Sequence, residues 1–141
     1  MDLGLRDKVT IVAASSKGLG RAVAEEFARE GARVVMCSRD EAAIRAAAED
    51  VQRRTGAEVQ WTVADVGTAE GCQKLVKTAV DKFGSVDILV SNAGGPPPGL
   101  FDDLDDAAWQ KAVGITLLSA VRLTRLVLPT CAKAAAARSC T

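Results

Sequence analysis

The stretch KVTIVAASSKGLGRAVAEEFARE, residues 8–30, decides the fold that this sequence predicts. Its first part, 8–13, is a short apolar run rich in β-branched residues, which predicts a buried strand. Its last part, 18–30, is amphipathic and predicts a helix that begins at a glycine turn. The apolar residues expected on one face of this helix are Leu19, Val23 and Phe27. A strand that leads through a tight turn into a helix begins a βαβ unit.

The rest of the chain repeats this alternation. Further strands are expected at 33–38, 58–63 and 86–90, and further helices at 40–54, 68–83 and from 105 onward. Asp40, Thr68 and Asp105 are suited to cap the N-termini of these helices. Strands and helices that alternate with short links predict a parallel sheet with right-handed crossovers, and therefore an α/β fold.

The last helix carries a long apolar stripe. Its expected members are Trp109, Val113, Thr116, Leu117, Ala120, Thr124 and Val127. Pro129 has no backbone N–H, so we expect it to kink or end this helix. The remaining letters, CAKAAAARSCT, are low in complexity and show no strand pattern. We therefore expect one domain over 1–129 and a divergent tail over 130–141.

Composition and charge narrow the class of protein. The 141 residues suffice for one buried core, with an apolar share of 48% and a charged share of 26%. Eighteen basic residues balance 18 acidic ones, which argues against non-specific binding of nucleic acid. The apolar runs are too short to span a bilayer, and the N-terminus has no signal-peptide pattern, so no membrane partner and a cytoplasmic location are expected.

The four cysteines indicate reduced thiols. They are scattered, no CxxC occurs and the chain has no histidine, so no metal site is expected. A disulfide between Cys131 and Cys140 stays open as an alternative.

Four motifs follow one another along the chain. They are AASSKGLG at 13–20, ADV at 64–66, SNAG at 91–94, and Trp109 with TLLSA at 116–120. In this order and spacing the chain resembles the classical short-chain dehydrogenase/reductase family, especially the branch that includes 3-oxoacyl-acyl-carrier-protein reductases. The resemblance runs to Pro129 and implies the N-terminal portion of a family member. It also implies a Rossmann-type three-layer αβα fold with strand order 3-2-1-4, truncated before the remaining strands.

The resemblance implies a site for NAD(P). The glycine turn would wrap the phosphates and the adenosine ribose, Asp65 would accept from the adenine amino group, and SNAG would close over the cofactor. The cofactor-binding residues it implies are Ala14, Ser15, Ser16, Lys17, Gly18, Leu19, Gly20, Ser38, Arg39, Asp65, Val66, Asn92, Ala93 and Gly94. Simpler alternatives stay open, because Asp65 suits a turn and Asn92 suits a bond to loop backbone. Ala14 stands at a family glycine, and its Cβ is expected to crowd the turn.

Two cations favour NADP over NAD. Asp40 lies about 20 residues beyond the turn, where an acid would hold the ribose of NAD, but it reads better as an N-cap. At the tip of the second strand stand uncharged Ser38 and then Arg39, and Lys17 adds a cation on the same side. An arginine there attracts a 2′-phosphate, which an acid would repel.

The catalytic residues of the resembling family are missing. Its tyrosine, lysine and serine would lie beyond residue 141, the chain has no tyrosine, and Thr116 stands at the family's asparagine position. The sequence therefore predicts the cofactor-binding half of an NADP-dependent oxidoreductase that acts on small carbonyl or alcohol substrates. The alternative is a catalytically dead nucleotide-binding or interaction fragment. In the resembling family the last helix pairs with the same helix of a neighbouring subunit, which implies a homo-oligomer through 106–128. Without a further neighbour, the 86–90 strand would be an exposed apolar edge of the sheet.

Overall fold

Four parallel strands form one sheet in the computed structural model, which describes residues 1–139. The strands are β1 (Val9–Val12), β2 (Arg33–Ser38), β3 (Val59–Val63) and β4 (Ile88–Val90). Their order is β3-β2-β1-β4, and in the central register Ile11 pairs with Val35 on one side and Leu89 on the other. The expected α/β fold and strand order 3-2-1-4 are confirmed.

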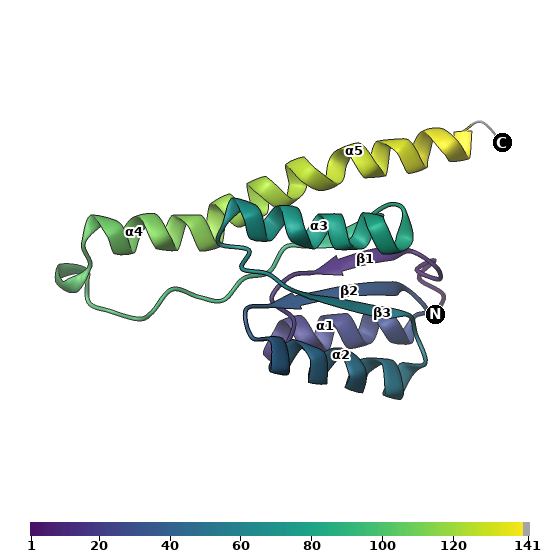
Figure 1. The fold of residues 1–141 in the computed structure, drawn as a ribbon, viewed down its shortest axis with the longest axis horizontal. Coiled ribbons are helices and arrows are strands. Elements are labelled where there is room, and N and C mark those ends of the chain that lie inside the picture. The colour runs from purple at the N-terminus through teal and green to yellow at the C-terminus, as the bar shows by residue number, and fades with distance from the viewer. Residues whose placement is uncertain (140–141) are drawn as a thin grey trace.

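Helices cover both faces of this sheet (Figure 1). Helices α1 (Gly18–Arg29) and α2 (Glu41–Thr55) lie on one face, and α3 (Ala69–Phe83) and α5 (Ser119–Ser139) lie on the other. Successive residues of a strand point to opposite faces. Val34 and Met36 accordingly enter the core under α1 and α2, whereas Val35 and Cys37 enter the core under α3 and α5. A strand buried on both faces needs a continuous apolar run, which β2 has.

The helix N-termini form where capping residues were expected. The carboxylate of Asp40 accepts from the Ala43 N–H (3.1 Å), and that of Asp105 accepts from the Ala108 N–H (2.9 Å). The Thr68 hydroxyl accepts from the Gly71 N–H (3.0 Å). Each bond satisfies a backbone donor that the first turn of a helix leaves unpaired.

The inward face of α1 differs from the expected one. Small residues, namely Gly20, Ala24 and Ala28, are buried there, while Val23 and Phe27 are half-buried and Leu19 is 83% exposed. The expected place of Leu19 was wrong, because α1 packs on the sheet through its smallest residues. The inward face of α3 is apolar, with Cys72, Leu75, Val76 and Ala79 buried and Val80 packed beside them.

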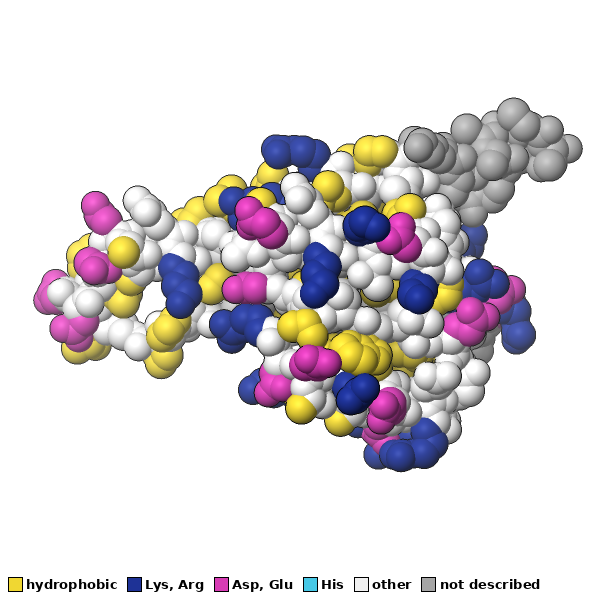
Figure 2. Space-filling model, viewed as in Figure 1, with side chains coloured by type: hydrophobic (Ala, Val, Ile, Leu, Met, Phe, Trp, Pro, Cys, Tyr) yellow, Lys and Arg dark blue, Asp and Glu magenta, His cyan; other side chains and the backbone are white. Residues whose placement is uncertain are grey.

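The last helix consists of three segments. After a 3₁₀ turn, η1 (Phe101–Asp103), α4 (Asp106–Val113) leads through a π-helical turn, η2 (Gly114–Leu118), into α5. A π turn holds more residues than an α turn and changes which residues face inward. Of the residues expected in the apolar stripe, only Val127 is buried. Ser119 and Leu123, which are not among them, are buried as well. Figure 2 shows hydrophobic side chains on the surface around α4 and along the first part of α5.

Pro129 does not end this helix, since α5 continues to Ser139. Of the two outcomes expected at Pro129, an end of the helix is wrong, and a kink stays a prediction. The boundary between a domain at 1–129 and a tail at 130–141 stays a prediction. Residues 140–141, and with them the alternative disulfide to Cys140, lie outside the described residues.

By length and composition alone, the helical segment Asp106–Cys131 could cross a membrane: an 18-residue window within it has a mean hydropathy of 1.5, and 22% of that window is buried. Each apolar run of the sequence is by itself too short to span a bilayer, but this helix joins several of them into one longer segment. The core helix of a soluble protein passes the same test, so this is weak evidence for a membrane span.

Candidate functional site

A cavity of about 610 Å³ lies at the carboxyl edge of the sheet. The segments that follow all four strands contribute to its lining, and α4 adds a further wall. Its lining residues are Ala14, Ser16, Lys17, Ser38, Arg39, Asp40, Ala43, Ala64, Asp65, Val66, Gly67, Gly94, Gly95, Pro97, Lys111 and Ile115. Ligands of open parallel sheets bind at this edge, because the loops after the strands converge there.

The turn between β1 and α1 borders this cavity through Ala14, Ser16 and Lys17, and Gly18 lies beside the lining. Gly18 has a φ of 59°, and a Cβ built on it would meet no heavy atom within 4 Å, so its outer side is open. Lys17 precedes α1 in an extended conformation, and its side chain makes no capping hydrogen bond. An open turn in front of free helix N–H groups suits a negatively charged ligand.

Gly20 brings α1 close to the turn. A Cβ built on this residue would lie 2.3 Å from the Ala14 carbonyl oxygen and 2.8 Å from Nδ2 of Asn92. Any larger residue would therefore push the helix away from the turn, so the close approach requires glycine.

Ser15 fastens the turn from below. Its buried hydroxyl donates to the Val12 carbonyl (2.7 Å) and accepts from the Cys37 N–H (3.3 Å), and its own N–H donates to the Cys37 carbonyl (2.9 Å). The side chain thus joins β1 to β2 and is not part of the cavity lining. Burial raises the pKa of the neighbouring Cys37 thiol to about 11, so this thiol stays protonated at neutral pH.

Asn92 fastens the turn from the β4 side. Its amide nitrogen donates to the carbonyl oxygens of Ala13 (3.2 Å) and Ala14 (3.1 Å). This is the bond to loop backbone that the sequence left open as an alternative. Ala93 packs against the core, and Gly94 reaches the cavity.

Asp65 is held in a turn at the end of β3. Its Oδ1 accepts from the Gly67 N–H (2.9 Å), and its carbonyl accepts from the N–H (3.1 Å) and hydroxyl (2.9 Å) of Thr68. Gly71 packs directly behind it, since a Cβ on Gly71 would lie 1.9 Å from the Asp65 carbonyl oxygen. Sequence analysis missed Gly71, and its signal was a glycine inside the first turn of a helix, where helix formers are preferred.

Charged residues of both signs meet at the end of β2. Lys17 and Arg39 line the cavity, and so does Asp40. The Asp40 carboxylate accepts from the Ala43 N–H, as an N-cap does, and its carbonyl accepts from the Ser38 hydroxyl (3.0 Å). The expected role of Asp40 as a helix cap is confirmed.

Lys111 of α4 and Ile115 of η2 also line the cavity, and sequence analysis missed both. No local pattern marks them, because their place depends on how α4 crosses the sheet edge. Thr116 is exposed outside the lining, and its hydroxyl donates to the Ala112 carbonyl (2.7 Å).

The cavity gathers eight of the expected site residues and leaves six outside its lining. Those in the lining are Ala14, Ser16, Lys17, Ser38, Arg39, Asp65, Val66 and Gly94; those outside it are Ser15, Gly18, Leu19, Gly20, Asn92 and Ala93. Ser15, Gly20 and Asn92 shape the turn from behind, as their contacts above show. In residues 1–139, no group of three or more metal-ligating side chains was found.

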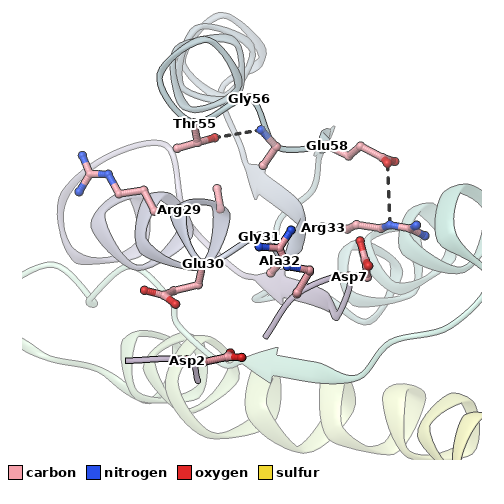
Figure 3. Close-up of a pocket in the computed structure, with 13 residues that line it drawn as sticks. Asp2, Asp7, Arg29, Glu30, Gly31, Ala32, Arg33, Thr55, Gly56 and Glu58 are labelled. Atoms are coloured by element: carbon pink, nitrogen blue, oxygen red, sulfur yellow. Dashed lines mark hydrogen bonds and ion pairs between the residues drawn. The ribbon is translucent and has the colours of Figure 1, made fainter. Parts of the chain in front are cut away.

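A second cavity, of about 620 Å³, lies at the opposite edge of the sheet (Figure 3). Helices α1 and α2 end there, at Arg29 and Thr55, and helix C-termini disfavour anions. Its charges are mixed, with Glu58 directed toward Arg33 at 3.9 Å. This cavity is therefore a poor site for phosphates.

The parallel sheet and the cavity at its carboxyl edge define a Rossmann-type α/β protein. The chain belongs to the short-chain dehydrogenase family, since the family model described as short chain dehydrogenase matches residues 8–138.

Named relatives and solved structures agree with this family. The chain is 39% identical over 126 residues to the rabbit (Oryctolagus cuniculus) protein "Dehydrogenase/reductase SDR family member 4". The matched region covers 89% of this chain and 48% of the relative. It is similar, with a TM-score of 0.90 and 36% identity, to L-sorbose reductase from Gluconobacter frateurii complexed with NADPH and L-sorbose, over 93% of this chain and 50% of that one. NADH-dependent reductase A1-R′, complexed with NAD, is similar with a TM-score of 0.88 and 29% identity, over 99% and 58%. The chain thus spans about half the length of these relatives.

Proposed function

We propose that this chain is the cofactor-binding half of an NADP-dependent oxidoreductase of the short-chain dehydrogenase type. The observation that carries the proposal is that Lys17 and Arg39 line one cavity with Ala14 and Ser16 of the turn before α1, at the carboxyl edge of the sheet. The family supports a nicotinamide cofactor, and the cavity's chemistry supports the phosphorylated one.

The residues present fit such a cofactor. The uncapped N-terminus of α1 and the open side of Gly18 suit the pyrophosphate, and Lys17 and Arg39 suit a 2′-phosphate. Asp65, held in its turn by Gly67, would accept from the adenine amino group. The bound cofactor would supply hydride transfer between its nicotinamide and a small carbonyl or alcohol substrate.

NADP is favoured over NAD because Asp40, the acid that could hold the ribose of NAD, caps α2. Its carboxylate caps α2 and accepts a backbone N–H, so it is less available to a ribose hydroxyl. Arg39 and Lys17 form no ion pair with an acid within the described residues. Two unpaired cations at the ribose end favour the extra phosphate of NADP. L-sorbose reductase, complexed with NADPH, is a relative of this kind.

By itself the 141-residue chain is proposed to bind the cofactor without turnover. It contains no tyrosine, and the Thr116 hydroxyl is exposed and bonded to its own helix. The runner-up is a catalytically dead nucleotide-binding or interaction fragment of such a protein. The 3-oxoacyl-acyl-carrier-protein reductase-like branch and a cytoplasmic location stay predictions.

The test measures binding and turnover separately on the purified chain. NADPH and NADH are titrated by the fluorescence of the reduced nicotinamide, and NADPH oxidation is followed with a panel of ketones. Tighter binding of NADPH than NADH, without oxidation, is expected. Replacing Arg39 and Lys17 with alanine is expected to weaken NADPH more than NADH. Equal losses of affinity for NADPH and NADH would contradict the choice of NADP. Oxidation of NADPH would contradict the proposal that the chain binds the cofactor without turnover.

A further inference from the structure

We propose that Lys111, on α4, is a third cofactor-binding cation of this cavity and contacts the phosphates of NADP from the wall opposite Lys17 and Arg39. The inference rests on the proposed function, because it names a further residue of the same site. Lys111 lines the cavity together with both other cations.

The two walls come from opposite faces of the sheet. The turn that carries Lys17 runs into α1, which lies on the face shared with α2. Helix α4 instead continues through η2 into α5, which lies on the face shared with α3 (Figure 1). A ligand in the cavity would therefore have Lys111 on one side and the glycine turn on the other.

Contacts with the loop after β3 hold the segments that continue α4, namely η2, which carries Gly114 and Ile115, and α5, which carries Arg122. A Cβ on Gly67 would lie 3.1 Å from Cγ1 of Ile115, and one on Gly114 would lie 3.6 Å from the Gly67 carbonyl oxygen. The Arg122 guanidinium donates to that same carbonyl at 3.4 Å. Lys111 precedes Ile115 by one helical turn, so both side chains lie on the same side of the helix.

The charge balance of the cavity calls for an anion. Its lining holds three cations, Lys17, Arg39 and Lys111, and two acids, Asp40 and Asp65. Each acid already accepts a backbone N–H. Among the side chains that the structure describes, those of residues 1–131, none of the three cations lies in a salt bridge. Unpaired cations that converge on one cavity are stabilised by a polyphosphate ligand and repel one another without it.

The test compares NADPH affinity for the wild-type chain, Lys111→Gln and Lys111→Arg at low and high ionic strength. Lys111→Gln is expected to weaken NADPH about three- to fivefold at low salt, and less at high salt, because the contact is partly exposed. Lys111→Arg is expected to keep most of the affinity. The matched control is Lys74→Gln, which removes one positive charge at an exposed position of α3 outside the cavity.

The outcomes separate this inference from the function on which it rests. A wild-type chain that does not bind NADPH overturns both. If the wild type binds NADPH but Lys111→Gln behaves like Lys74→Gln, or its loss does not depend on salt, the role of Lys111 is overturned while the proposed function stands. Unchanged far-ultraviolet circular dichroism and thermal midpoint show that Lys111→Gln leaves the fold intact.

Discussion

Ala14 holds a backbone conformation that favours glycine. Its φ is 48°, in the left-handed region, where a Cβ costs about 1 kcal/mol or more. The family pattern has a glycine at this position, so the chain keeps the shape of the turn and bears the strain.

Relieving this strain is the first prediction. Ala14→Gly is expected to raise the free energy of unfolding by about 0.5–1 kcal/mol, because the relief exceeds the extra entropy of an unfolded glycine. Urea denaturation measures it. Ala13→Gly is the neighbouring control, since Ala13 is fully buried and has no positive φ, and it should lower stability. A loss of stability in both variants would show that Ala14 is not strained.

Gly71 offers a second prediction, because it leaves no room for a side chain behind Asp65. Gly71→Ala would place a Cβ 1.9 Å from the Asp65 carbonyl oxygen, so the turn must move. We expect a loss of about 2–3 kcal/mol in the free energy of unfolding, together with weaker NADPH binding. Glu70→Ala, one residue earlier and exposed, is the control. Wild-type stability in Gly71→Ala would mean that α3 is packed less tightly against this turn.

At the scale of elements, Asp50 links α2 to α1. Its carboxylate pairs with Arg21 of α1 and with Arg53 and Arg54 of its own helix. Desolvation alone would raise the pKa of Asp50, but the guanidinium groups of Arg54, Arg53 and Arg21 outweigh it and hold the pKa below its ordinary value of 3.8. The charged carboxylate is therefore favoured in the folded protein.

The pH dependence follows from the direction of this shift. A carboxyl group with a lowered pKa stabilises the fold above its ordinary value of 3.8, and the stabilisation is lost as the pH falls through the folded pKa. Asp50→Asn is thus expected to lower stability at neutral pH and to make it less sensitive to acid. Urea denaturation across this pH range measures the effect. The exposed pair of Lys77 and Asp81 provides Asp81→Asn as a control with a smaller effect. Parallel pH profiles for wild type and Asp50→Asn would contradict the link.

Local signals explain which elements were predictable. Caps such as Asp40 and Thr68, and apolar runs such as β2, act through neighbours in sequence, and their positions were correct to within one or two residues. The buried face of α4 and α5 was not predictable, because the π turn at Gly114–Leu118 changes the helical phase and no residue type requires it. The hydrophobicity of Leu19 likewise led to a wrong prediction of the inward face of α1, because this helix packs through Gly20 and Ala24.

The same distinction holds for the candidate site. Motif residues such as Lys17, Arg39 and Asp65 were found from the sequence, because they follow strand ends that converge. Lys111 and Gly71 were not, because their roles depend on the packing of α4 and α3 against the loop after β3. The sequence assigned Ser15 to the phosphates, which stays a prediction; its hydroxyl bonds to backbone of β1 and β2 behind the turn.

At the scale of the whole molecule, the sheet ends in β4, a strand that pairs with β1 along one side. β4 is an edge strand, half-buried, and apolar side chains remain exposed on the helix beside it, including Leu117 (57%) and Leu128 (60%). Edge strands and apolar patches of this kind favour association. The homo-oligomer implied for 106–128 is proposed to form through this helix.

Association is the fourth prediction. Sedimentation velocity over a range of concentrations is expected to show self-association that the double variant Leu117→Glu, Leu128→Glu reduces. Leu3→Glu, at an exposed leucine near the N-terminus, is the control and should leave it unchanged. A monomer at every concentration, or equal effects of both variants, would argue against the helix as the interface.

The bonds that hold the glycine turn bear on the kinetics of binding. Ser15 ties it to β2 and Asn92 ties it to the segment after β4, so folding alone sets its shape. A loop that becomes ordered only when its ligand binds loses conformational entropy on binding. This turn is already ordered in the folded protein, so binding does not carry that entropy loss. Association at this end of the cavity should therefore resemble docking onto a rigid surface, limited by diffusion and electrostatic steering.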